Sequence, residues 1–131
     1  MKKFLAAFVA LSLVTVFVVG CGSAASASSG SSSNGITDVH LGYTNFLQSS
    51  VTISKGGSIK LIDDASSIHI ISIGSWVNGK PVPAVETGAP QVNNVEVTNQ
   101  NSQTIGPFTT AGTYHLYCTI HPGMNLTVIV N

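Results

Sequence analysis

The region from residue 36 to the C-terminus is built of short segments rich in alternating apolar and polar residues. They are Val51–Ile53, Ser58–Ile62, Ile68–Ile73, Asn94–Thr98, Gln103–Ile105, Thr113–Cys118 and Leu126–Val130. Clusters of glycine, proline, asparagine and serine separate them, and no stretch keeps the 3.6-residue period of a helix. We therefore expect an all-β fold, a sandwich or closed barrel of about seven to eight strands.

One stretch, residues 77–92, interrupts this pattern. It contains Pro81, Pro83 and Pro90, which cannot donate hydrogen bonds to a sheet. We predict a long loop here, with one short helical turn. Trp76 precedes the loop, and we expect its ring to pack in the core or to anchor the loop.

The first 20 residues are typical of an export signal. Lys2 and Lys3 precede 16 uncharged residues, fewer than the roughly 20 that cross a bilayer comfortably. The sequence Val18-Val19-Gly20-Cys21 resembles the lipobox of bacterial lipoproteins, which implies cleavage before Cys21 and lipid attachment to its thiol. An ordinary signal peptide and an uncleaved helix are the alternatives.

Residues 21–35 comprise this cysteine and a linker of glycine, serine and alanine, and we expect the linker to be flexible. Residues 36–131 are then the folded domain. The resemblance implies an exported protein, lipid-anchored to the outer face of the cell membrane or in the periplasm.

Charge is scarce in this chain. Only 8% of the residues are charged and the formal net charge is zero, where about 25% charged residues is usual. The lack of a basic surplus argues against nucleic-acid binding. The expected domain holds one thiol, Cys118, which is a free thiol, an intermolecular disulfide or a metal ligand.

The last segments bring metal-binding side chains together. Along the strand, Tyr114, Leu116 and Cys118 point to one face, so Cys118 reaches the strand end facing the interior. A turn carrying His121 follows, and Met124 begins the returning strand. Thiolate and thioether together favour copper, and a blue-copper site takes two histidines, a cysteine and a weak axial methionine.

The second histidine must come from elsewhere in the chain. His115 alternates away from Cys118, and His40 lies near the start of the domain. His69 follows a polar turn at the beginning of a strand, where a site at one end of a sandwich can be reached. We therefore select His69 and expect His40 and His115 to be structural or exposed to solvent.

The spacing Cys118-x-x-His121-x-x-Met124 resembles the copper loop of the cupredoxins, the plastocyanin and azurin type of blue copper protein, and is most similar to amicyanin. Phe108 to Gly112 resembles the usual lead into this strand. The resemblance implies a Greek-key β-sandwich and one type 1 copper ion held by His69, Cys118, His121 and Met124.

The resemblance also implies a function. It indicates an electron carrier rather than an enzyme, a monomer that serves redox proteins such as a cytochrome, a terminal oxidase or a reaction centre. His121 would carry the electron at the surface, with Ile120, Pro122 and Gly123 as docking surface. Tyr117 matches a second, remote electron port in plastocyanins, although the acidic patch found there is not evident here.

The sequence departs from the family pattern at two places and leaves other functions open. Ile70 stands where the family often has asparagine, and Thr119-Ile120 where it often has proline, and such neighbours of the ligands tune the reduction potential and colour of a metal site. A copper storage or delivery protein is one alternative, although exposed methionine and histidine clusters are typical of that class. A metal-free β-sandwich binding module is another.

Overall fold

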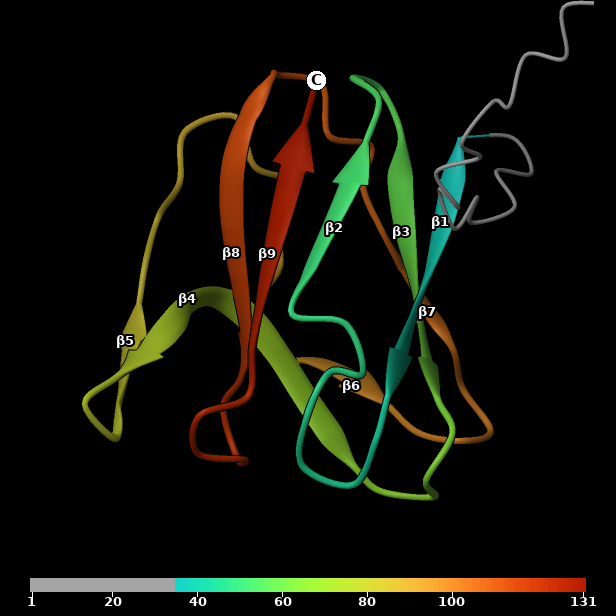
Figure 1. The fold of residues 1–131 in the computed structure, drawn as a ribbon, viewed down its shortest axis with the longest axis vertical. Coiled ribbons are helices and arrows are strands. Elements are labelled where there is room, and N and C mark those ends of the chain that lie inside the picture. Colours follow the sequence, from blue (N-terminus) through green and yellow to red (C-terminus); the bar gives the residue numbers. More distant parts are fainter. Residues whose placement is uncertain (1–34) are drawn as a thin grey trace, which may run out of the picture.

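A computed structural model describes residues 35–131. The predicted signal peptide, Cys21 and almost all of the linker lie outside the described residues. The described part is all β and contains no helix (Figure 1). Its nine strands are β1 Ile36–Leu41, β2 Ser50–Ile53, β3 Ser58–Asp63, β4 His69–Val77, β5 Lys80–Pro83, β6 Val95–Val97, β7 Gln103–Ile105, β8 Gly112–Cys118 and β9 Asn125–Val130.

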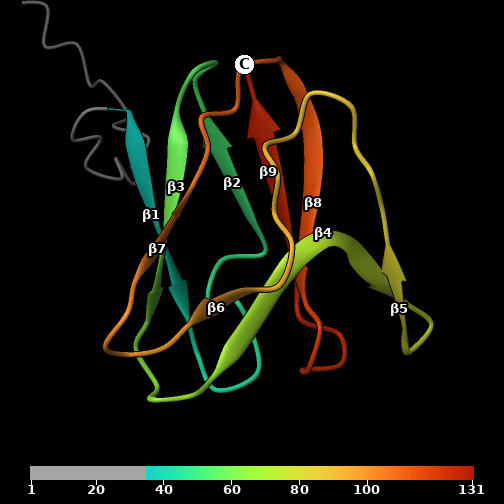
Figure 2. The ribbon, with the colours of Figure 1, turned by 180° about the vertical axis from the view of Figure 1, so that it is seen from behind.

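These strands form two sheets that face each other, as Figures 1 and 2 show from opposite sides. The smaller sheet has the order β1-β3-β7, with β1 parallel to β3. The larger has the order β2-β9-β8-β4-β5, with β6 also paired to β4 and β2 parallel to β9. The expected all-β sandwich is confirmed.

Alternation along the strands fills the space between the sheets. Inward side chains are fully buried on both, with Leu41 and Leu61 on the smaller sheet and Leu116 and Val128 on the larger. Phe108 is buried among them, and its ring packs against Tyr114 at a centroid distance of 5.5 Å. The outward residues of β3 and β9 are only partly buried or exposed, as expected for a half-buried strand.

Two strands were not expected from the sequence. β1 pairs with β3 over six residues and buries Val39 and Leu41 completely. β5 pairs with the end of β4 and lies at the sheet edge, where a missing N–H donor is tolerated.

The turn between β4 and β5 explains why this hairpin forms. Asn78 and Gly79 both have positive φ, 50° and 74°, as the two central residues of a type I′ hairpin turn require. The helical turn predicted within residues 77–92 is wrong. After β5 the chain makes a simple turn, in which the Ala89 N–H donates to the carbonyl of Glu86 at 3.0 Å.

Among residues 35–131 there is no helix of the length and apolar character needed to cross a bilayer.

Gly74 lies where β4 pairs with β5, at φ 134°. A Cβ there would collide with the backbone carbonyl of Val82. We expect Gly74→Ala to lower the free energy of unfolding by about 2 kcal/mol or more, measured by chemical denaturation. Gly79→Ala is the matched control, because its φ is also positive but nothing lies within 4 Å of the added Cβ, and it should cost only about 1 kcal/mol. Equal losses would contradict the steric argument.

Candidate metal centre

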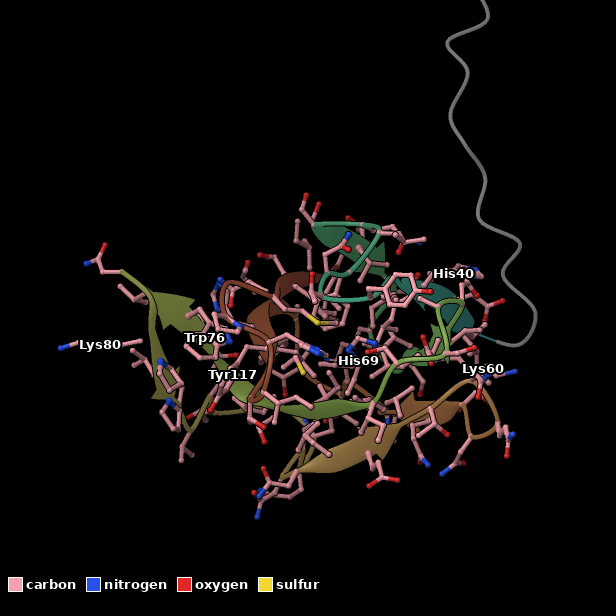
Figure 3. The ribbon with its side chains drawn as sticks, turned by 90° about the horizontal axis from the view of Figure 1, so that it is seen from below. His40, Lys60, His69, Trp76, Lys80 and Tyr117 are labelled. Atoms are coloured by element: carbon pink, nitrogen blue, oxygen red, sulfur yellow. The ribbon has the colours of Figure 1, made fainter. Side chains whose placement is uncertain are left out.

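Three strand ends meet at one end of the sandwich. β4 begins at His69, β8 ends at Cys118, and β9 begins directly after Met124. β4 and β8 are antiparallel and pair Ile71 with Cys118, so His69 lies at the edge where the β8–β9 loop turns. Figure 3 looks onto this end and shows His69 near its centre.

The three expected nitrogen and sulfur donors lie close together. The Nδ1 atom of His121 lies 3.4 Å from Sγ of Cys118 and 3.2 Å from Nδ1 of His69, and all three donor atoms lie within 4.8 Å of one another. His69 and Cys118 are fully buried, whereas His121 is partly exposed. Sequence reasoning therefore selected, from four histidines, the two that the fold brings to Cys118.

Backbone hydrogen bonds fix the two ligand segments to each other. The Ile70 N–H donates to Sγ of Cys118 at 3.4 Å, and the Thr119 N–H donates to the carbonyl of Ile70 at 2.8 Å. The main chain of Ile70, the residue after His69, therefore connects the two segments. This connection does not need an asparagine side chain at residue 70.

Met124 is buried in the same loop and exposes 1% of its surface. The Cys118 N–H donates to the carbonyl of Met124 at 3.1 Å, and the Met124 N–H donates to the carbonyl of His121 at 3.2 Å. These bonds fold the chain back, so that the backbone of Met124 lies beside the backbone of Cys118. Its role as an axial thioether ligand stays a prediction.

The other two histidines lie outside this cluster and are paired with carboxylates. Nδ1 of His40 lies 2.8 Å from Oδ2 of Asp64, and Nδ1 of His115 lies 2.8 Å from Oε1 of Glu86. The His115 N–H also donates to Oε2 of Glu86 at 2.8 Å. Both pairs are partly exposed to solvent.

Solved structures of the same architecture are known, although no protein-family model matches the sequence and no curated protein matches it as a relative. Amicyanin from Paracoccus versutus is 20% identical, with a TM-score of 0.56 over 77% of this chain and 86% of that one. A mutant fern plastocyanin is 22% identical, with a TM-score of 0.54 over 72% of this chain and 100% of that one. A purple cupredoxin from Nitrosopumilus maritimus is 20% identical, with a TM-score of 0.55 over 72% and 98%.

The chain has the cupredoxin fold. Its cluster of His69, Cys118 and His121 fits the ligand set expected for that fold. The donor chemistry agrees, because two imidazoles and a thiolate are the three strong ligands of a blue-copper site.

Within this cupredoxin fold, Trp76 has a contact that the sequence did not predict. Its indole N–H donates to the carbonyl of Cys118 at 2.7 Å. The Trp76 N–H donates to Oδ1 of Asn125 at 2.7 Å, and the Asn125 amide donates back to the carbonyl of Trp76 at 3.1 Å. Trp76 therefore connects β4 to the end of β8 and the start of β9. The spacing of residues along the sequence could not predict this contact, because β4 and β8 are far apart in the chain.

Tyr117 was expected at the surface, but its side chain is 3% exposed. Its ring packs edge-on against Trp76 at a centroid distance of 6.4 Å, and the two lie side by side in Figure 3. It also borders a hollow of about 390 Å³ between β4 and the loop after β5. Tyr117 is therefore a buried neighbour of Cys118 and not an exposed surface residue.

The environment of His69 disfavours its charged form. Burial lowers the pKa of His69 below its ordinary value, and the neighbouring His121 lowers it further, while Asp63 and the backbone of Gly42 oppose this. Nε2 of His69 has no hydrogen-bond partner among the described residues, and Oδ1 of Asp63 lies 3.8 Å away. The polar turn before His69 was noted in the sequence, but this buried carboxylate was not.

The lowered pKa of His69 predicts how the stability of the metal-free protein depends on pH. Below about pH 6.5 the unfolded chain binds a proton at this histidine while the folded chain does not. The free energy of unfolding should therefore fall as the pH decreases from 6.5, until the lowered pKa is reached. Urea denaturation at pH values from 8 to 5 should show a smaller decrease in the free energy of unfolding for His69→Asn than for the parent. Identical declines would contradict the prediction.

Proposed function

We propose that residues 36–131 form a type 1 copper domain that carries single electrons between redox proteins. His69, Cys118 and His121 would hold the ion, with Met124 as the axial ligand. The observation that carries this proposal is the convergence of three donor atoms within 4.8 Å at one end of a cupredoxin fold. Bound copper would supply a one-electron couple between Cu(I) and Cu(II).

The chain holds these donors in place by its own structure. Sγ of Cys118 accepts the Ile70 N–H, and the Thr119 N–H fixes the adjoining turn. Full burial of His69 and Cys118 excludes water from their side of the centre. A donor set that is already assembled needs little rearrangement between two oxidation states, which favours an electron carrier over an enzyme that transforms a substrate.

The exposed side of the centre suits contact with a partner protein. His121 is the ligand that reaches the surface, next to Ile120, which is half exposed, and to exposed Pro122. Ile68, which precedes His69, and Tyr43 and Leu47, in the β1–β2 loop, are also exposed apolar residues. We call the five exposed apolar residues the apolar rim: Tyr43, Leu47, Ile68, Ile120 and Pro122.

The apolar rim would dock redox partners such as a cytochrome, a terminal oxidase or a reaction centre. Residues 1–20 would direct export, and a lipid on Cys21 would tether the monomeric domain outside the cytoplasm. Support for export and tethering comes from the sequence: the charged start, the apolar run and the lipobox-like residues before Cys21.

The spectrum of the copper-loaded protein tests the centre directly. We expect an intense visible charge-transfer band and a narrow copper hyperfine splitting in the EPR spectrum, both lost in Cys118→Ser because they need the thiolate. His115→Gln is the matched control, since His115 lies outside the cluster, and it should keep both signals. A colourless copper complex would contradict a type 1 site and favour copper storage or delivery, and the absence of copper binding would favour the metal-free module.

Copper storage or delivery is the competing function. It would be favoured if the loaded protein passes its copper quickly to an acceptor apoprotein but shows no reversible one-electron wave in voltammetry. The electron-carrier proposal expects the reverse result.

The apolar rim makes a separate prediction about electron exchange between copies of this protein. A charge at Ile120 would repel its counterpart when two domains meet at His121, so we expect Ile120→Glu to slow electron self-exchange at least tenfold at low salt, with partial recovery at high salt. NMR line broadening in mixtures of the reduced and oxidised protein measures the rate. Val85→Glu is the control, because Val85 is 97% exposed on the loop after β5, and an equal effect there would contradict a docking role for the rim.

A further inference from the structure

Asp63 is a buried carboxylate at the end of β3, and its side chain is 0% exposed. Oδ1 accepts the Ala65 N–H at 2.9 Å, and Oδ2 accepts the Ser67 N–H at 2.9 Å. Both bonds close the turn that leads to His69. Asp63 therefore fixes the segment that delivers this ligand.

The same carboxylate faces the far side of the His69 ring. Nδ1 of His69 points to His121, and Nε2 lies on the opposite side, 3.8 Å from Oδ1 of Asp63. Nε2 is buried and makes no hydrogen bond within residues 35–131, and the backbone of Gly42 and the carboxylate of Asp63 are the two groups that favour a proton on this ring. The imidazole ring thus lies between the donor cluster and a buried negative group.

Closing a turn does not by itself require a charged residue, because asparagine and serine side chains also accept backbone N–H bonds. A carboxylate removed from water is costly unless something compensates its charge. Two N–H groups compensate part of it, and a cation held on His69 would compensate more. A carboxylate behind a metal-bound histidine orients the ring and makes its nitrogen a stronger donor.

We propose that Asp63 is a positioning residue for His69 that favours the more highly charged ion at the site. Its negative charge, 3.8 Å from Nε2, favours a hydrogen on that nitrogen, so that the lone pair of Nδ1 faces the donor cluster, and the same charge stabilises Cu(II) more than Cu(I). The proposal rests on the copper site proposed above. Asp63 thereby lowers the reduction potential of the centre.

The neighbouring Asp64 offers a matched control. Its side chain is 45% exposed and pairs with His40 at 2.8 Å, so its charge is screened by water and salt. Asp63→Asn and Asp64→Asn remove the same charge one residue apart, but only the first removes it from the buried side of His69.

Voltammetry of the copper-loaded variants tests the proposal. Asp63→Asn should weaken the preference of the site for Cu(II) over Cu(I) at least tenfold. This change raises the reduction potential by about 60 mV for a one-electron couple. Asp64→Asn should leave the potential close to that of the parent. If the two variants have the same potential, the proposal is overturned.

Two further measurements separate positioning from a merely structural role. Co(II) titration should show a 10- to 100-fold loss of affinity in Asp63→Asn and none in Asp64→Asn. Urea denaturation of the metal-free variants measures what the turn alone contributes. A loss of stability with unchanged potential and unchanged Co(II) affinity would assign Asp63 to the turn only, against the proposal. If Asp63→Asn does not fold, Asp63→Ser makes the same comparison, because its hydroxyl can accept one of the two N–H bonds.

Co(II) affinity also keeps this test distinct from that of the proposed function. If the parent shows no thiolate-dependent copper band, the electron-carrier proposal fails. Asp63 is still tested, because a Co(II) affinity that depends on Asp63 and not on Asp64 supports the positioning role without copper.

Discussion

The antiparallel register of β4 against β8 is the constraint on which the rest of the centre depends. Pairing Ile71 with Cys118 places His69 beyond the end of β8, and the Thr119 N–H bonds to the Ile70 carbonyl at that point. A shift by one residue would turn the side chains of β4 to the opposite face and carry His69 away from the cluster. The donor set is therefore assembled by strand pairing, and the identity of the side chain at residue 70 matters little because its main chain makes both contacts.

The sequence predicted the centre better than it predicted the edges of the sheets. Cys118 and His121 are close neighbours in the chain, so strand alternation and one turn sufficed to bring them together. His69 is distant in sequence, and its position at the start of a strand was the deciding argument. The same reasoning missed β5, because the prolines of that stretch were given more weight than Asn78-Gly79, the stronger signal for a hairpin.

Contacts between distant elements explain the remaining differences. Tyr117 has the alternation of an outward-facing residue, yet it is buried: its ring packs against Trp76, and it lines a hollow whose other wall is the loop after β5. The bond from the Trp76 indole to the Cys118 carbonyl joins residues whose proximity follows only from the pairing of β4 with β8. The position of Asp63 was also not predictable. A polar residue at a turn is usually exposed, so the sequence does not indicate that this carboxylate is buried behind a histidine.

The buried and the exposed side of the centre differ in charge. The buried side would tune the reduction potential, and the exposed side would dock partner proteins. On the buried side, Asp63 acts through His69 at low dielectric, where an ionic interaction is strong and little screened. On the exposed side, His121 lies among uncharged residues of the apolar rim. A carboxylate placed on that rim would be weakened by salt and would also select or repel partners by charge. With the copper and docking roles proposed above, burying the charge behind the other histidine would let the chain set the electronic preference of the centre while its contact surface stays uncharged.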